Sequence, residues 1–255
     1  MKNSETKSQG LMINKIHNMD CMECMAMMPD KSIDYCITSP PYNMQHGSIS
    51  NGKKTEFTKY ETFQDDFSVD EYYIQQKEMI SELLRVTKNH IFYNIQMITG
   101  NKFALHRLMG DFYKNIKEVF IWNKGFGSPA ISENVFNSAF EYIIVFSNNQ
   151  PEKRYFHDAN FKRGTQSNIF TLFNKHSNKY SDIHKAVFPL DMPRYFMQNF
   201  GSENDIWFDP YMGTGTTGLG AVMEKRRFIG SDISEKYCEL ARKRIEAESN
   251  QVSIF

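Results

Sequence analysis

DIWFDPYMGTGTTG, residues 205–218, decides the fold of this 255-residue chain. Its first residues are typical of a buried strand, its glycines of a tight turn, and the residues after Gly215 of a helix start. Gly213 and Gly215 carry no side chain, so we expect the backbone there to approach a ligand closely. Asp209 ends the strand and can pair with a ligand ammonium, while the helix start favours a carboxylate. The stretch therefore predicts a ligand-binding turn.

A second acidic residue favours a nucleoside-like ligand. Asp232 ends the next expected strand, 17 residues after Gly215. This is close to the spacing of roughly 20 residues at which an acid meets ribose hydroxyls. The glycine order that binds phosphates, followed by Lys and Ser or Thr, is absent, which disfavours ATP. An adenosyl ligand without a pyrophosphate fits these residues better.

Strands and helices alternate on both sides of this stretch. Expected strands cover residues 11–16, 33–38, 91–95, 119–122, 141–146, 205–208 and 227–230. Expected helices cover residues 21–28, 70–86, 102–113, 193–200, 217–225 and 234–248. Such alternation predicts an α/β protein with a doubly wound, mainly parallel sheet, in which ligands bind where the strands end.

The turn Ser39-Pro40-Pro41-Tyr42 follows the expected strand 33–38 and is the most specific feature of the sequence. Two consecutive prolines fix the backbone and remove two donors, so the turn presents carbonyl oxygens and the Ser39 hydroxyl as acceptors. Such acceptors suit an exocyclic amino group, and Tyr42 offers a flat face for a flipped base. An ordinary rigid loop or a proline-rich partner motif is the alternative reading of this turn alone.

Composition limits the class of protein without deciding it. The net charge is zero, which neither supports nor excludes a nucleic-acid partner. The stretch 150–185 is basic, with Lys153, Arg154, Lys162, Arg163, Lys175, Lys179 and Lys185, and is either a contact surface or a solvated face. The cysteines, Cys21, Cys24, Cys36 and Cys238, are expected as core thiols, with no metal site. A polar start and the lack of a long apolar run favour a cytoplasmic protein without membrane contact.

Ser39-Pro-Pro-Tyr42 together with Asp209-Pro-Tyr-Met-Gly-Thr-Gly-Thr216 resembles the amino-methyltransferase family of bacterial and phage DNA methylases. The catalytic motif precedes the cofactor motif, which resembles the circularly permuted β group with its Rossmann-like sheet. The resemblance implies S-adenosyl-L-methionine as cofactor and double-stranded DNA as substrate. It implies methyl transfer to cytosine N4 or adenine N6 of a flipped base. A homodimer and a cognate restriction endonuclease are the further partners that it allows.

The resemblance also assigns roles to residues. Catalytic roles go to Ser39, Pro40, Pro41 and Tyr42, and cofactor contacts to Asp20, Thr38, Phe188, Asp209, Tyr211, Gly213, Gly215, Thr216 and Asp232. The stretch 147–182 is expected to be a small target-recognition insertion between a catalytic half, 11–146, and a cofactor-binding half, 183–248. DNA contacts are expected from Lys153, Arg154, Lys162, Arg163, Lys175 and Lys179. Near Phe188, Lys185 departs from the proline that is usual in the family.

Two residues point to different target bases. Ser39 stands where adenine-specific relatives often have Asp, which favours cytosine N4, whereas Asn43 after Tyr42 is common in adenine enzymes; both bases stay open. Cys36 lies within an expected strand, so it is expected in the core and not as the nucleophile of carbon-5 methylation. An RNA or protein amide methyltransferase usually shows Asn-Pro-Pro-Tyr after the cofactor motif. A catalytically inactive DNA-binding subunit is the other alternative, which the intact motifs disfavour.

Overall fold

The main sheet of the molecule is mixed and mostly parallel. The computed structural model describes residues 11–44, 49–50, 53–54, 65–128, 133–172 and 189–252. Its strands are β1 (Lys15–Asn18), β2 (Tyr35–Thr38), β3 (Ile49–Ser50), β4 (Lys53–Lys54), β5 (His90–Ile95), β6 (Ile116–Ser128), β7 (Ser138–Ser147), β8 (Ile169–Thr171), β9 (Ile206–Asp209) and β10 (Arg227–Asp232). Within these residues, eight strands form one sheet in the order β1-β10-β9-β2-β5-β7-β6-β8, and β3 pairs only with β4.

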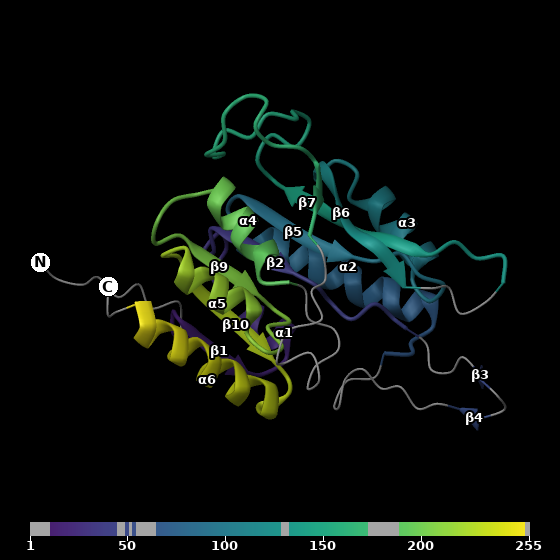
Figure 1. Ribbon diagram of the computed structural model, residues 1–255, viewed down its shortest axis with the longest axis horizontal. Helices are drawn as coiled ribbons and strands as arrows, with labels where there is room; N and C mark the ends of the chain where they lie inside the picture. The colour runs from purple at the N-terminus through teal and green to yellow at the C-terminus, as the bar shows by residue number, and fades with distance from the viewer. Residues whose placement is uncertain are drawn as a thin grey trace, which may run out of the picture.

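Helices cover both faces of this sheet (Figure 1). They are α1 (Cys21–Ala26), α2 (Val69–Val86), α3 (Lys102–Asp111), α4 (Asp191–Asn199), α5 (Thr216–Met223) and α6 (Glu235–Val252). The first three share one core, which includes Ile80 and Leu105, and the last three share the other, which includes Phe196 and Ala241. One layer of helices on each face of the central sheet confirms the predicted doubly wound α/β fold. No helix in the described part of the chain is long and apolar enough to cross a bilayer.

Strand direction brings chemistry-bearing ends of several strands to one edge. The strands β1, β10, β9, β2 and β5 run parallel to one another and end at the same edge, here called the carboxyl edge. β7 is antiparallel to β5 and to β6, so the beginning of β7 also lies there: Tyr142 pairs with Ile95, and Glu141 with Trp122. Side chains from both halves of the sequence therefore meet along this edge.

Part of the stretch predicted as an insertion belongs to the sheet. Residues 169–171 form β8, which pairs in parallel with β6, although the sequence reading expected no strand there. Asp158 accepts a hydrogen bond from the Tyr35 hydroxyl (2.6 Å) and lies 3.0 Å from Nε2 of His90. A three-residue strand between polar segments leaves no periodic signal in the sequence, which explains why it was missed. The predicted boundaries of the insertion at 147 and 182 stay a prediction.

Candidate active site

The proline turn and the glycine turn lie next to each other, because β2 and β9 are neighbours in the sheet. The Thr38 hydroxyl donates to Oδ1 of Asp209 (3.0 Å), and the Thr217 hydroxyl donates to Oδ2 (2.5 Å). The backbone amide of Tyr211 also donates to Oδ1 (3.0 Å). Burial raises the pKa of Asp209 to about 6. With 1% of its surface exposed, Asp209 bridges the two motifs, and its direct contact with a ligand ammonium stays a prediction.

Asp232 holds the glycine turn in place. Its Oδ2 accepts a hydrogen bond from the Gly213 amide (2.9 Å), and its Oδ1 accepts one from the Ser234 amide (2.9 Å). Gly215 has a φ of +83°, and a Cβ added there would lie 2.7 Å from Cβ of Ala241. The close approach that requires Gly215 is therefore to α6, whereas the sequence reading expected an approach to a ligand. The turn is fixed from both sides before any ligand binds.

Two features of the glycine turn suit the carboxylate end of an amino-acid ligand. The first turn of α5 has no side-chain cap, so its amide groups are available to an anion. Oγ1 of Thr214 is buried and has no hydrogen-bond partner among the described residues, and such atoms usually receive one from a ligand or water. The residues present therefore fit an adenosyl ligand that carries an amino-acid group.

The other predicted cofactor residues lie around this turn. Asp20 is exposed and caps α1, and its neighbour Asn18 donates to the backbone oxygen of Asp232 (3.1 Å). The Thr216 hydroxyl is buried and accepts from Arg244 (3.1 Å), so it faces α6. The Tyr211 hydroxyl accepts from Sγ of Cys21 (3.4 Å). Phe188 lies outside the described residues.

The turn after β2 joins a network of polar side chains, here called the base-side network. Oγ of Ser39 lies 2.8 Å from the Tyr42 hydroxyl, which donates to Oε2 of Glu141 (2.8 Å). Nδ2 of Asn94 donates to the Tyr42 hydroxyl (2.7 Å) and to Glu141 (2.9 Å). Nζ of Lys124 lies 3.2 Å from the other carboxylate oxygen of Glu141. These contacts fix the Tyr42 ring at the carboxyl edge.

Three members of this network were not among the predicted site residues. Asn94 lies next to the end of β5, Lys124 lies on β6 and Glu141 on β7. Asn94 and Glu141 are polar residues in largely apolar strands, and such a residue is costly to bury without a partner, although this alone does not identify a site. Oδ1 of Asn94 is also buried without a partner among the described residues. The network is therefore rich in acceptors for N–H groups.

The backbone oxygens of the proline turn differ in their availability. The Pro41 oxygen accepts a hydrogen bond from the Tyr72 hydroxyl (2.8 Å). The Pro40 oxygen receives no hydrogen bond from the described residues. The sequence reading assigned the acceptor role to Pro40, and the geometry leaves this oxygen for a substrate.

Asn43 has a structural task. Its side chain donates to the backbone oxygens of Phe67 (3.0 Å) and Gly100 (2.8 Å), and its Oδ1 accepts from the Phe67 amide (2.8 Å). The residue is fully buried, with a φ of +58°. All of these side-chain bonds close the loop after Tyr42, and the target base stays open.

Comparison with known proteins decides the family. The sequence pattern of the family described as DNA methylase, which covers N6 and N4 methyltransferases, matches residues 33–243. The chain belongs to this family of DNA methylases. The predicted resemblance is thereby confirmed, and with it the prediction of a DNA methyltransferase that uses S-adenosyl-L-methionine.

Curated relatives of this DNA methylase are similar over their full length. The type II methyltransferase M2.DpnII of Streptococcus pneumoniae is 27% identical over 98% of the chain and 99% of its own length. The orphan methyltransferase M.BamHII of Bacillus amyloliquefaciens is 25% identical over 85% of the chain and 90% of its own length. Both alignments extend over most of the chain and most of each relative.

Solved structures show the same fold at low sequence identity. The PvuII DNA methyltransferase, described as cytosine-N4-specific, superposes with a TM-score of 0.67 at 18% identity, over 93% of the DNA methylase and 91% of its own chain. M1.HpyAVI, solved in complex with S-adenosylmethionine, gives a TM-score of 0.64 at 18% identity, over 91% and 98% of the two chains. At this identity the likeness confirms the fold.

Among the cations predicted to contact DNA, Arg154 lies away from the carboxyl edge. Arg154 pairs with Glu118 (2.7 Å), which is in register with Val145. Val145 is four residues along β7 from Glu141, or about 13 Å at strand spacing. Lys153, Lys162 and Arg163 are exposed beside this segment, and Lys175 and Lys179 lie outside the described residues. DNA contact by these residues stays a prediction.

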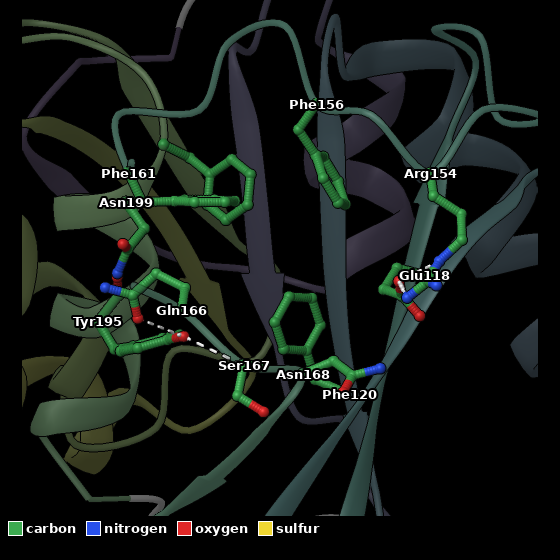
Figure 2. Close-up of a pocket in the computed structure, with 11 residues that line it drawn as sticks. Glu118, Phe120, Arg154, Phe156, Phe161, Gln166, Ser167, Asn168, Tyr195 and Asn199 are labelled. Carbon is green, nitrogen blue, oxygen red and sulfur yellow. Dashed lines mark hydrogen bonds and ion pairs between the residues drawn. The ribbon is translucent and has the colours of Figure 1, made fainter. Parts of the chain in front are cut away.

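A cavity of about 350 Å³ opens beside this cationic segment. Figure 2 shows the rings of Phe120, Phe156 and Phe161 around it, with the Arg154–Glu118 pair at its rim. None of its lining residues belongs to the base-side network or to the glycine turn. The cavity lies between α4 and residues 154–168, which also contact each other through Tyr195 and Gln166, and it includes none of the residues predicted for methyl transfer.

Proposed function

We propose that this DNA methylase transfers the methyl group of S-adenosyl-L-methionine to N4 of a cytosine that is flipped out of duplex DNA. The observation that carries the proposal is the bond between the Thr38 hydroxyl and Asp209. It joins the acceptor turn of the base side directly to the glycine turn of the cofactor side. The reacting groups can therefore be held at the short distance that transfer between two bound molecules needs.

The cofactor side of the proposal uses the end of β10 and the start of α5. The first amide groups of α5 and the Thr214 hydroxyl suit the carboxylate of the cofactor. Asp232 and Asp20 lie on neighbouring strand ends, where an acidic side chain reaches ribose hydroxyls and the adenine edge. When bound there, S-adenosyl-L-methionine supplies an electrophilic methyl group on its sulfonium sulfur.

The base side of the proposal uses the proline turn. The Pro40 oxygen and the Ser39 hydroxyl accept hydrogen bonds from the exocyclic amino group, which orients its nitrogen. The Tyr42 ring provides the stacking face, held by its hydroxyl bonds to Glu141 and Asn94. These groups are in place before the base arrives, so their contribution is positioning and electrostatic preorganisation.

Three observations support cytosine as the target. Ser39 is uncharged and sits within hydrogen-bond reach of Tyr42, in the place where adenine-specific relatives often have Asp. The sequence feature that pointed to adenine was Asn43, and its side chain is fully used in closing the loop. The PvuII enzyme, which shares the fold, is described as cytosine-N4-specific. Adenine N6 is the alternative that the test below decides.

The partners follow from the same proposal. Double-stranded DNA is the substrate, in keeping with the type II methyltransferases among the relatives. A second copy of the chain and a cognate restriction endonuclease are proposed partners from the resemblance alone. A cytoplasmic location, expected from the sequence, places the enzyme with the DNA of its host.

Mass spectrometry of nucleosides tests the target base. DNA from a host that expresses the protein is compared with DNA from the same host expressing Tyr42→Ala, which controls for host methylation. We expect N4-methylcytosine only with the unchanged protein. N6-methyladenine in its place assigns the enzyme to the alternative base. Cofactor-dependent tritium transfer to RNA or protein, with none to DNA, contradicts the proposal, and no transfer to any substrate favours the inactive subunit.

A further inference from the structure

The hairpin formed by β6 and β7 ends in exposed apolar side chains. Phe136 is 98% exposed and Val135 is 60% exposed, immediately before β7 begins. A single exposed apolar residue is ordinary, but a fully exposed Phe beside an exposed Val is an apolar tip that water solvates poorly. Asn134, with a φ of +62°, lies in the turn that presents this tip. The tip therefore suits a partner with an apolar surface.

The same hairpin carries part of the active site. Glu141 and Lys124 of the base-side network lie on β7 and β6. Ser138 still pairs with Ser128, so the paired ribbon continues three residues, or about 10 Å, beyond Glu141. Figure 1 shows this hairpin extending to the right past the end of β5. The tip thus projects from the carboxyl edge, on the side where a flipped base must enter.

Other exposed apolar side chains gather at the same edge. Met44 follows the proline turn, Met97 follows β5, and Phe103 lies in the first turn of α3, and all three are exposed. Like the hairpin tip, they lie in segments next to the carboxyl edge. An exposed apolar surface at this edge suits contact with either the stacked bases of DNA or another protein.

We propose that Phe136, supported by Val135, enters the duplex at the place that the target base leaves. This inference rests on the proposed function, because only a flipped base leaves such a gap. Extruding a base costs unstacking free energy, and apolar side chains that insert between base steps offset that cost. An aromatic ring is suited to this task because every base has a flat face on which it can stack.

Distance favours DNA over a second copy of the chain as the occupant. The major groove is about 8.5 Å deep, and the hairpin reaches about 10 Å beyond Glu141. A tip of this length can cross the groove and touch the base stack while the extruded base lies beside Tyr42. The hairpin also joins tip and pocket in one element, so that one duplex can meet both at once.

The test compares two DNA substrates that differ only in the cost of base extrusion. The site that the enzyme modifies is first mapped on plasmid DNA, and duplex oligonucleotides of that sequence are made. In one duplex the target base is paired, and in the other it faces an abasic position, which makes extrusion cheap. Methyl transfer is measured for the unchanged protein, for Phe136→Ala and for Phe136→Trp. Tyr113→Ala, which removes a 65% exposed ring after α3, is the matched control.

We expect Phe136→Ala to lower kcat/KM about ten- to hundredfold on the paired duplex, the usual loss for one stacking ring. On the abasic duplex the loss should stay below about threefold, and Phe136→Trp and Tyr113→Ala should act like the unchanged protein on both. Equal losses on both duplexes, or no loss on either, overturn the inference. So does a change in molecular mass of Phe136→Ala by light scattering without DNA, which assigns the tip to a dimer. If the unchanged protein modifies neither duplex, the proposed function itself fails.

Discussion

The cofactor side and the base side of this active site are built in different ways. On the cofactor side, one continuous run from β9 to the start of α6 supplies the strands, the turn and the acid that fixes it. Its key contacts use backbone amides, as when Gly213 and Ser234 donate to Asp232. On the base side, separate segments supply Tyr42, Asn94 and Glu141, whose side chains hold one another. Single side-chain changes should therefore damage the base side and spare the cofactor side.

The strongest way to break this comparison is Tyr42→Ala. The variant loses the stacking face and the hydroxyl that contacts Ser39, Asn94 and Glu141, so we expect turnover to fall more than a hundredfold. Cofactor affinity, measured by calorimetry, should change less than about threefold, because the glycine turn has its own supports. Tyr42→Phe keeps the ring and loses only the hydroxyl bonds, and should cost about tenfold. Loss of cofactor binding in Tyr42→Ala would show that the two sides are not separable.

Asp209 is the point where the two sides are joined, and its charge can be tested through pH. Burial raises the pKa of Asp209 to about 6, whereas the pKa of an Asp in an unfolded chain is about 3.9. The folded state therefore binds the proton more tightly, and this stabilisation is present below pH 4 and lost as pH rises to about 6. The loss amounts to about 2 to 3 kcal/mol.

Asp209→Asn removes this titration. We expect the free energy of unfolding of Asp209→Asn, measured in urea, to gain about 2 to 3 kcal/mol relative to the unchanged protein between pH 4 and pH 7. Other titrating groups cancel in this difference. Parallel stability curves for the two proteins would mean that Asp209 ionises normally in the folded state.

Glu141→Gln sharpens the comparison with a smaller change. It keeps the shape of the side chain and removes the charge that faces Lys124. A lost charge-assisted bond should lower kcat about tenfold, with cofactor affinity unchanged. Lys124→Met in the same chain is the matched partner, because removing both charges should cost less than the sum of the single changes. Additive losses would show that the two side chains act independently.

Replacing both Lys162 and Arg163 with Ala gives the smallest expected effect. If both contact phosphates, DNA binding should weaken severalfold, and the slope of log affinity against log salt should fall by about 1 to 2. Lys243→Ala on α6 serves as a control that also removes an exposed cation. An unchanged slope removes both residues from the DNA interface.

The same difference explains what the sequence could predict. Strand, glycine turn and helix follow each other between residues 205 and 223, so local patterns reveal the cofactor side. Asn94 and Glu141 meet only because β5 and β7 pair in one register, with Asn94 opposite Ile143. Nothing local in either strand specifies that pairing, and an apolar strand with one polar residue reads as ordinary core.

The fold also gives two residues structural roles that their sequence motifs do not predict. Gly215 is predicted to let a ligand approach, which stays a prediction, and the fold shows that it also admits Ala241 of α6. Asn43 was weighed as a mark of base specificity, and it closes a loop. In both cases the residue type was informative, and its neighbour in the fold decided the role.

The contacts of Asp158 with Tyr35 and His90 limit how this enzyme can be re-engineered. A natural plan for changing the recognised sequence is a chimera in which residues 148–168 come from a relative. Asp158 binds the Tyr35 hydroxyl and faces Nε2 of the fully buried His90. A graft without an acid at this position leaves two polar groups stranded inside the sheet, at a cost of about 1 to 3 kcal/mol each. A segment chosen for exchange should therefore keep Asp158 and lie entirely before it or entirely after it.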